Sequence, residues 1–408
     1  MHILFLTDNF PPEGNAPATR TYEHAREWVK LGHNVTIITG APNFPEGKVF
    51  NGYKNSWYQK ETIDGIEVRR VKTFITANEG FAKRILDFLS FMLSSFIAGL
   101  FVKKIDVVVA TSPQFFTAVA GWALSGVRRK PFVFELRDIW PASITAVGAM
   151  KKSFIIVWLE KLELFLYQRA DMIIAVTNSF KDELVIRGVP VSKIEVVLNG
   201  VDLSQYSPAY TKNSILAEGY DLEGKFVIGY IGTHGMAHAL ESVVLAAEIL
   251  QEYKDIRFLF AGGGAAKPIV EKLVESKKLL NVISLPRQPK SRMPEVWSLC
   301  DLSLISLKDT ALFKKVIPSK IFESMGMGIP MVAPIPIGEA SKIIESTKSG
   351  VIVEPENPEK LANEIIKLFE NNKELKRLQM QSFQAAKLFC RKRLANDMLN
   401  LIESLLSK

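Results

Sequence analysis

Short apolar runs alternate with longer amphipathic segments along the first half of the chain. Apolar runs of this length, bounded by polar residues, are typical of buried parallel strands joined by helices. The predicted strands are His2–Thr7, Val35–Thr39, Val107–Ala110, Phe132–Leu136, Met172–Thr177 and Ile194–Leu198. The first helix is predicted from near Ala18 to Leu31, and a hairpin is predicted with its turn at Asp64-Gly65. The pattern therefore favours an α/β fold with a parallel sheet.

The alternation stops over the polar stretch from about Ser204 to Lys225 and then begins again. The second set of predicted strands is Phe226–Ile231, Arg257–Ala261, Val282–Leu285, Leu302–Ser306, Met331–Ala333 and Val351–Val353. A long helical region is predicted from Pro358 to Lys408. The interruption predicts two domains, residues 1–203 and 204–387, since 408 residues are too many for one compact core.

The net charge of +8 is spread over both halves of the chain, without a basic tail. This distribution argues against a nucleic-acid-binding arm and is compatible with an anionic small ligand or an anionic membrane surface. The two cysteines, Cys300 and Cys390, lie in apolar contexts, so a reducing compartment without a disulfide framework is expected. The apolar start of the chain lacks a basic leader region and is interpreted as a strand, not as a signal peptide.

Two segments are candidates for membrane contact. Ile85–Val102 is apolar and has basic residues at both ends, and its length is borderline for a membrane span. It contains Asp87, three serines and a glycine, and it lies between two predicted strands, which favours a buried or membrane-grazing helix over a span. Lys151–Arg169 is predicted to be an amphipathic helix that packs on the sheet or touches a bilayer.

Glycine-containing loops follow several predicted strands. Gly232–Gly235 and Gly262–Gly264 each come directly after a strand, where backbone N–H groups can cradle a diphosphate. Each loop is a weak signal alone. Gly14, in the loop after the first strand, allows either a close approach of backbone to ligand or a plain turn.

A lysine and a glutamate lie at the start of a short predicted helix. Pro318-Ser319 forms a turn, and Lys320 and Glu323 then share one helix face. A cation can meet phosphate and a carboxylate can accept hydrogen bonds from sugar hydroxyls, although this pattern alone favours an ordinary surface pair on a crossover helix. Asp138, just past the strand at Phe132–Leu136, is a candidate acid, base or hydrogen-bond acceptor, or the N-cap of a helix.

Several kinds of chemistry are disfavoured by what the sequence lacks. His234 and His238 are four residues apart, but no third metal ligand is evident beside them. The chain has no Asp-x-Asp pair, no Gly-Lys-Ser/Thr phosphate loop and no nucleophile elbow. A metal-independent reaction without a cofactor is therefore expected.

Taken in order, the motifs resemble those of a known family. Asn199-Gly200-Val201-Asp202, the glycines 262–264, and Pro318 to Glu323 followed by Gly328 to Ala333 resemble the retaining nucleotide-sugar glycosyltransferases of the family 4-like type. Their fold, termed GT-B, has two facing Rossmann-like domains. The segments Pro11–Pro17 and Arg137–Pro141 look like the branch that builds bacterial surface polysaccharides, in particular transferases of L-fucosamine-type sugars.

The resemblance implies roles for individual residues. Glu323 would hold the ribose of the donor, and Lys320 would face its diphosphate together with the backbone around Gly338 and Glu339. The resemblance also places three further groups of residues. Arg287 would border the base, Gly14 and Asn15 would lie near the donor diphosphate and the acceptor, and a helix over about 388–408 would return to the first domain.

The chain also departs from the family pattern. Lys315 stands where a first glutamate is usual, and the usual Arg and Lys are not evident in Gly232–His238. The histidine often found near Asp138 is absent, so Asp138 and Lys320 are the candidate catalytic residues. The other candidate donor-binding residues are Gly232, His234, Gly235, Gly263 and Lys315.

The resemblance predicts a retaining transferase that moves a sugar from a UDP-sugar, such as UDP-N-acetyl-L-fucosamine, to a polyprenyl-diphosphate-linked glycan. The expected setting is O-antigen or capsule synthesis by a cytoplasmic enzyme held peripherally at the inner face of the membrane. Residues 1–203 would then face the acceptor and residues 204–387 would bind the donor. The alternatives are a UDP-sugar epimerase or hydrolase and an inactive nucleotide-sugar-binding protein.

Overall fold

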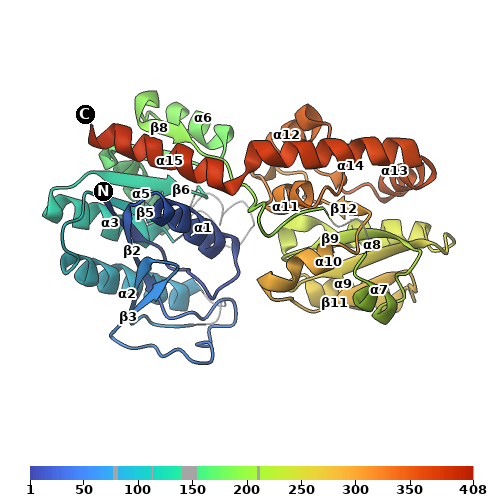
Figure 1. The fold of residues 1–408 in the computed structure, drawn as a ribbon, viewed down its shortest axis with the longest axis horizontal. Coiled ribbons are helices and arrows are strands. Elements are labelled where there is room, and N and C mark those ends of the chain that lie inside the picture. Colours follow the sequence, from blue (N-terminus) through green and yellow to red (C-terminus); the bar gives the residue numbers. More distant parts are fainter. Residues whose placement is uncertain (77–80, 113, 140–153, 209–211, 408) are drawn as a thin grey trace. The chain divides into compact units, whose positions relative to one another are not determined.

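The computed structural model describes residues 1–76, 81–112, 114–139, 154–208 and 212–407. The chain forms two compact units (Figure 1). The first contains Met1–Leu198 and Arg391–Lys408, and the second contains Asn199–Cys390. The division falls a few residues from the predicted domain boundaries, and it assigns the Asn199–Asp202 turn to the second unit. Within the described residues, no helix combines the length and apolar character that crossing a membrane requires.

The first unit is built on an eight-stranded sheet in the order β3-β4-β2-β1-β5-β6-β7-β8. Its strands are β1 His2–Leu6, β2 Asn34–Gly40, β3 Tyr58–Ile63, β4 Ile66–Val71, β5 Val107–Thr111, β6 Phe132–Leu136, β7 Met172–Ala175 and β8 Ile194–Val196. All neighbouring strands pair in parallel except β3 and β4, which form the predicted hairpin around Asp64-Gly65. The predicted α/β fold is confirmed.

Two helices from opposite ends of the sequence cover one face of this sheet. Helix α1 (Ala16–Lys30) begins earlier than predicted because the Asn15 side chain accepts a hydrogen bond from the N–H of Ala18 and caps it. Helix α15 (Arg391–Leu406) packs on α1, where the indole N–H of Trp28 donates to the carbonyl of Ala395 at 2.8 Å. The last helix therefore returns to the first unit, as predicted.

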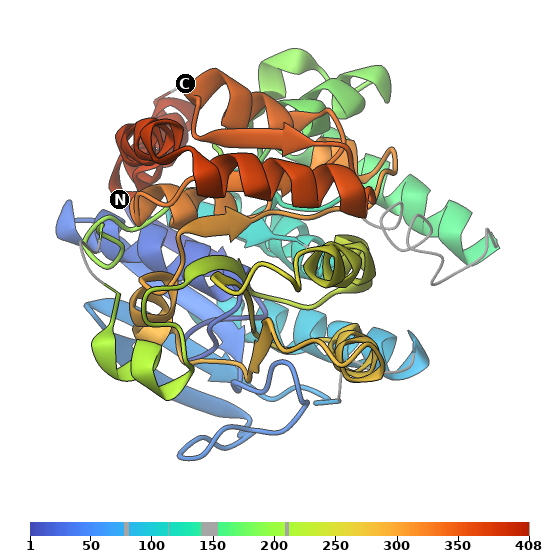
Figure 2. The same cartoon turned by 90° about the vertical axis from the view of Figure 1, so that its right-hand side faces the viewer.

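The opposite face of the sheet carries α2 (Phe81–Leu100), α3 (Phe115–Arg128) and α5 (Phe154–Arg169), as Figure 2 shows for α2 and α5. The chain reverses its direction across the sheet between β4 and β5, and right-handed crossovers then place the following helices on the other side. Helix α3 contacts both neighbours, with its Trp122 ring 5.1 Å from that of Phe165 on α5. A shorter helix, α6 (Asn178–Ile186), precedes β8.

The second unit has a six-stranded parallel sheet in the order β11-β10-β9-β12-β13-β14. Its strands are β9 Phe226–Ile231, β10 Ile256–Ala261, β11 Val282–Leu285, β12 Leu302–Leu304, β13 Met331–Pro334 and β14 Gly350–Val353. The chain moves from β9 outward to β11 and then continues on the other side of β9 with β12. The strand order thus reverses between β9 and β12.

The helices of the second unit are α7 Ser214–Gly219, α8 Leu240–Ile249, α9 Lys267–Ser276, α10 Met293–Trp297, α11 Lys320–Gly326, α12 Glu339–Thr347, α13 Pro358–Glu370 and α14 Asn372–Ala386. Helix α13 packs on α8, and α11 packs on α14. The predicted long terminal helical region is divided into three main helices. One break lies at Asn371, whose side chain accepts from the N–H of Glu374 and starts α14 anew.

Candidate functional site

The reversal of strand order in the second unit marks a candidate ligand site. Strands β9 and β12 are neighbours, with Gly229 paired to Ser303, and their connections leave toward opposite sides of the sheet. Open parallel sheets bind ligands at the carboxyl ends of the strands on either side of such a reversal. The loops after Ile231 and Leu304 therefore border the most favourable position for a ligand.

The two glycine-containing loops lie directly against each other at this edge. The N–H of His234 donates to the carbonyl of Gly263 at 2.9 Å, and the N–H of Ala266 donates to the carbonyl of His234 at 2.8 Å. Gly262 has φ +148°, and a Cβ built on it would lie 1.8 Å from the carbonyl oxygen of Gly232. A Cβ on Gly263 would meet nothing within 4 Å, so this glycine faces open space. The structure thus brings Gly232, His234 and Gly263 together at this edge of the sheet.

Lys320 reaches this edge from the first turn of α11. Its Nζ lies 3.4 Å from the centre of the Tyr230 ring, and its Cε lies 3.5 Å from where a Cβ of Gly232 would be. The side chain is buried, and Nζ has no hydrogen-bond partner among the described residues. Burial lowers the pKa of Lys320 to about 7, against the opposing effect of Glu323. A buried lysine at the switch point of the sheet, with no hydrogen-bond partner in the described residues, is placed to bind an anion.

Two histidines border Lys320, and neither carries charge at neutral pH. Nδ1 of His234 is 3.2 Å from the carbonyl oxygen of Gly232, and Nδ1 of His238 is 3.0 Å from that of Ser306. Because a carbonyl only accepts, each Nδ1 carries the hydrogen and each Nε2 is an acceptor. Burial, together with nearby Lys320, lowers the pKa of His234 to about 4 and that of His238 to about 3. The Nε2 atom of His234 is buried, and no described residue forms a hydrogen bond with it.

Glu323 lies one turn after Lys320 and is held by a tryptophan. The indole N–H of Trp297, at the end of α10, donates to Oε2 of Glu323 at 3.3 Å. The Trp297 ring is fully buried, and a buried indole N–H usually requires an acceptor. This contact was not predicted. The sequence signal for this contact was a tryptophan at the end of a short helix, because its indole N–H needs an acceptor when it is buried.

Gly338 lies where the loop before α11 meets the start of α12. A Cβ on Gly338 would lie 2.1 Å from the carbonyl oxygen of Lys314, so the two backbones approach closely. Lys315 ends the short 3-10 turn Phe313–Lys315 and is half-buried beside this contact, while Glu339 is buried in the first turn of α12. The structure thus groups Lys315, Gly338 and Glu339 around one helix N-terminus, which complements anions.

Gly235 and Arg287 are the other residues of this unit that were predicted to bind the donor. Gly235 precedes the short turn Met236–His238 and packs beside His238. Arg287 is exposed in the loop after β11, the outermost strand, which β10 separates from β9. The contact of Arg287 with a base remains a prediction.

Each half of the chain matches the model of a known protein family. Residues 17–205 match the model of Glycosyltransferase Family 4, and residues 216–384 match that of Glycosyl transferases group 1. The chain is a family 4-like glycosyltransferase. It is 24% identical over 372 residues to the colanic acid biosynthesis glycosyl transferase WcaI of Escherichia coli (strain K12), covering 88% of this chain and 90% of that one.

Solved structures show the same two-domain fold. Sucrose-phosphate synthase from Thermosynechococcus elongatus superposes with a TM-score of 0.78 at 14% identity, covering 100% of this chain and 99% of that one. Anabaena HepE, solved with UDP and glucose, superposes with a TM-score of 0.74 at 17% identity, covering 98% and 99%. The predicted GT-B fold of the glycosyltransferase is confirmed.

The first unit of the glycosyltransferase places Gly14 and Asn15 at the start of α1. Gly14 is exposed, whereas Asn15 caps the helix and donates through Nδ2 to Oδ1 of Asn9 at 2.6 Å. The neighbouring Glu13 is buried and accepts from the N–H groups of Asn43 and Phe44, each at 2.8 Å. Glu13, which was not predicted, thus fastens the long loop after β2 to the loop after β1.

Asp138 follows β6 at the carboxyl edge of the first sheet. Oγ of Ser112 accepts from the N–H groups of Arg137 at 2.7 Å and Asp138 at 3.2 Å, which fixes the backbone there. The Asp138 carboxylate is half-buried. The helix that it was alternatively expected to cap lies outside the described residues, so its role in the glycosyltransferase stays a prediction.

A buried ion pair lies near Asp138. Nε of Arg20 is 2.8 Å from Oε1 of Glu135, and both side chains are buried. Arg20 also donates to the carbonyls of Val197 and Leu198, the last residues of the first unit before the chain leaves it. Through these bonds, Arg20 of α1 holds the backbone at Val197 and Leu198, where the chain leaves the first unit.

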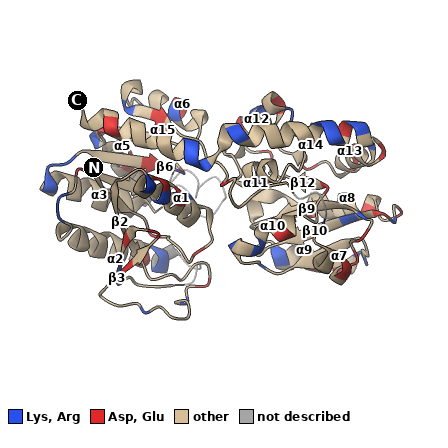
Figure 3. Ribbon diagram, viewed as in Figure 1, with Lys and Arg blue, Asp and Glu red and all other residues tan. Residues whose placement is uncertain are grey.

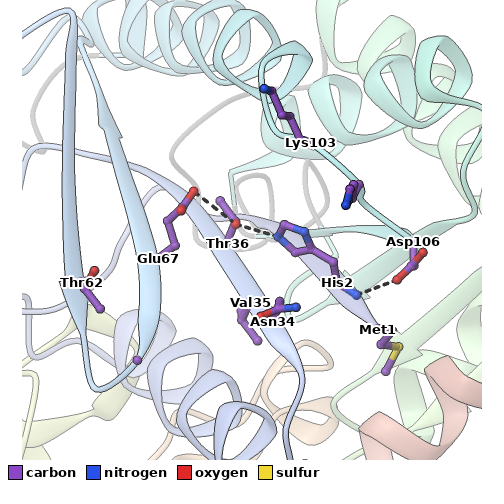
Figure 4. Close-up of a pocket in the computed structure, with 11 residues that line it drawn as sticks. Met1, His2, Asn34, Val35, Thr36, Thr62, Glu67, Lys103 and Asp106 are labelled. Carbon is purple, nitrogen blue, oxygen red and sulfur yellow. Dashed lines mark hydrogen bonds between the residues drawn. The ribbon is translucent and has the colours of Figure 1, made fainter.

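A polar pocket lies at the opposite edge of the first sheet (Figure 4). His2 and Thr36, at the amino ends of β1 and β2, are hydrogen-bonded at 2.8 Å, and the N–H of His2 donates to Asp106 at 2.7 Å. Ligands of open α/β sheets bind at the carboxyl edge, so this pocket is a poor candidate for the donor site. Among the described residues, no group of three or more potential metal ligands is found.

Proposed function

We propose that the second unit binds a UDP-sugar at the β9–β12 switch point and that the enzyme transfers the sugar to a lipid-linked glycan with retention of configuration. The observation that carries this proposal is the buried Lys320, whose Nζ lies beside the paired glycine loops and has no hydrogen-bond partner in the part of the chain that the structure describes. The structure of HepE with UDP and the name of WcaI support a UDP donor and a role in surface polysaccharide synthesis.

The proposed contacts divide the donor among three groups. Lys320 and the backbone at Gly263 meet the diphosphate, together with the N–H groups at the start of α12. Glu323, oriented by Trp297, accepts hydrogen bonds from the ribose hydroxyls. These contacts require no metal ion.

Departure of UDP places negative charge on the diphosphate, and a preorganised cation at this point stabilises the transition state. We propose that charged Lys320 has this role. The acceptor hydroxyl then attacks from the face that UDP leaves and gives its proton to the departing diphosphate, which retains the configuration without a covalent enzyme intermediate. Asp138 is proposed to orient the acceptor, and Gly14 and Asn15 are proposed to lie near the donor diphosphate and the acceptor.

The reaction itself tests the proposal. The protein is incubated with UDP-sugars, with and without a polyprenyl-diphosphate-linked glycan, and UDP release is measured. Release that requires the acceptor supports transfer. Release or isomerisation without the acceptor supports an epimerase or hydrolase instead, and binding of UDP without turnover supports an inactive binding protein.

We expect Glu323→Ala to weaken UDP binding by about 1–3 kcal/mol, because a hydrogen bond to a charged group is lost. Isothermal titration of the folded variant with UDP measures this change. The matched control is Glu345→Ala, which removes an exposed glutamate from α12 of the same unit. Equal UDP affinity in Glu323→Ala and wild type would contradict the ribose assignment.

We also propose that the enzyme docks on an anionic membrane through the outer surface of α2 and α5, here called the α2–α5 surface. Its exposed apolar side chains are Leu86, Leu93, Ile97, Phe154, Val157 and Trp158, with Phe101 directly after α2, and its exposed lysines are Lys83 and Lys161, with Lys103 and Lys104 in the segment after α2. Basic and acidic residues are mixed over both units (Figure 3), so charge alone does not mark this surface. Its exposed apolar side chains distinguish it. Apolar side chains rimmed by lysines suit the boundary between headgroups and acyl chains.

The double variant Leu93→Ser and Phe101→Ser should bind phosphatidylglycerol vesicles at least about ten-fold more weakly than wild type, because two exposed apolar groups no longer enter the bilayer. Vesicle flotation measures the bound fraction. Ile186→Ser on α6 is the matched control, since Ile186 is 84% exposed in the same unit but lies outside the α2–α5 surface. Equal flotation of the double variant and wild type would argue against this surface.

A further inference from the structure

We propose that binding of a nucleoside diphosphate in the second unit draws a proton from solvent onto Lys320, so that donor affinity falls as the pH rises above neutrality. The proposal rests on the donor site proposed above, and it concerns how that site is charged before and after the donor binds.

In the empty site, Lys320 lacks what normally keeps a lysine charged. The side chain is 7% exposed, and Nζ has neither a hydrogen-bond acceptor nor an ion-paired carboxylate among the described residues. Its close neighbour is the face of the Tyr230 ring, a weak partner for an ammonium group. A buried ammonium with so few partners pays a desolvation penalty that favours the neutral amine.

The charged and titratable groups around Lys320 come from four elements. Tyr230 belongs to β9, His234 and His238 follow it, and Glu323 lies on the same helix as Lys320. Lys267 and Glu271 of α9 act on His234, but the Nζ atom of Lys267 donates to the carbonyls of Gly262 and Leu285. Of these groups, only Glu323 favours the charged form of Lys320, and Trp297 already donates a hydrogen bond to one of its oxygens.

The two histidines do not supply the missing charge. The carbonyls of Gly232 and Ser306 fix both rings with the hydrogen on Nδ1, and both rings are neutral near pH 7. A diphosphate that enters this site therefore meets neutral imidazoles and an amine that is partly unprotonated. Its negative charge stabilises the ammonium form, so one proton moves from water or buffer onto Nζ as the complex forms.

The direction of the pH effect follows from this change. The pKa of free Lys320 is about 7 and the bound diphosphate raises it, so the complex holds more protons than the free protein wherever the pH lies between the two values. Uptake should be about half a proton at pH 7 and close to one at pH 8. Above pH 7, affinity should fall about ten-fold per pH unit until the pKa of the bound form is reached.

Isothermal titration of the full chain with UDP at pH 8, in two buffers of different ionisation enthalpy, counts the protons taken up. At this pH the phosphates of UDP are ionised and His234 is neutral in the free protein, so the count reports Lys320. We expect close to one proton for wild type and for His234→Gln. We expect none for Lys320→Arg, since a guanidinium is charged at every pH used.

UDP binding without proton uptake at pH 8 would overturn the proposal, as would uptake that persists in Lys320→Arg or disappears in His234→Gln. If the larger arginine prevents UDP binding, the wild-type count and the His234→Gln variant decide the question. A protein that binds no UDP between pH 6 and 9 would instead overturn the donor site itself, and the two failures are thus distinguishable.

Discussion

Replacing Lys320 with methionine should lower kcat/KM for sugar transfer about 100- to 1000-fold while leaving the protein folded. Methionine has nearly the length of lysine and can fill the space over Tyr230, but it cannot neutralise the departing diphosphate. The loss should appear in both UDP binding and kcat, because the cation acts on the donor before and during transfer.

The stability of Lys320→Met should change in the opposite direction from its activity. A lysine whose pKa is lowered to about 7 by folding destabilises the native state at neutral pH, since the unfolded chain binds the proton more tightly. Methionine removes this penalty, so Tm at pH 7 should be equal to or above that of wild type. The difference should shrink as the pH rises from 7 toward 10.5, the ordinary pKa of a lysine, because the unfolded chain then holds its proton less and less favourably.

Lys342→Met is the matched control, since Lys342 is an exposed lysine on α12 of the same unit. It should leave kcat/KM and Tm close to the wild-type values. Full transfer activity in a folded Lys320→Met protein would remove Lys320 from the proposed mechanism. A variant that loses activity only because it unfolds would show a lowered Tm and would contradict the stability argument.

Gly262→Ala should lower the free energy of unfolding of the second unit by at least about 3 kcal/mol. The new Cβ would lie 1.8 Å from the carbonyl oxygen of Gly232, and φ of +148° is a conformation that alanine rarely adopts. Relief requires the two glycine-containing loops to separate, which breaks the contact between Gly263 and His234. Chemical denaturation, followed by the fluorescence of Trp297, measures the change.

Gly263→Ala separates stability from donor binding at the adjacent residue. A Cβ there meets nothing within 4 Å, so unfolding should be nearly unchanged. If the diphosphate occupies this open side, UDP affinity should nevertheless fall, because the methyl group enters its space. Equal destabilisation by both substitutions would show that the loops do not touch as described.

The fold was largely predictable because most strands of both sheets are parallel and buried. Such strands read as continuous apolar runs, and β9 and β10 match their predicted ranges almost residue for residue. The break at Asn371 was missed because a capping asparagine within a long amphipathic pattern resembles an ordinary polar position. The start of α1 was missed for the same reason, since Asn15 caps it through a local contact.

The sequence could place the candidate residues at one edge of a sheet but could not predict the contacts between them. Strand ends locate Gly232, Gly263 and Lys320 at one edge, because parallel strands share an edge for their carboxyl ends. The position of Lys320 over Tyr230 and the bond from Trp297 to Glu323 depend on packing between residues far apart in sequence. Periodicity does not encode such pairs, so the lowered pKa of Lys320 could not be foreseen either.

The return of α15 to the first unit has a consequence for the order of folding during synthesis. The core of the first unit includes Leu394, Met398 and Ile402, which the ribosome adds after the whole second unit. The last buried apolar residues of the second unit, Ala386 and Phe389, precede α15 in the chain, so this core is complete while α15 is still being made. The unit that is synthesised first is therefore completed last. The indole N–H of Trp28 can form its native hydrogen bond only after Ala395 has been synthesised.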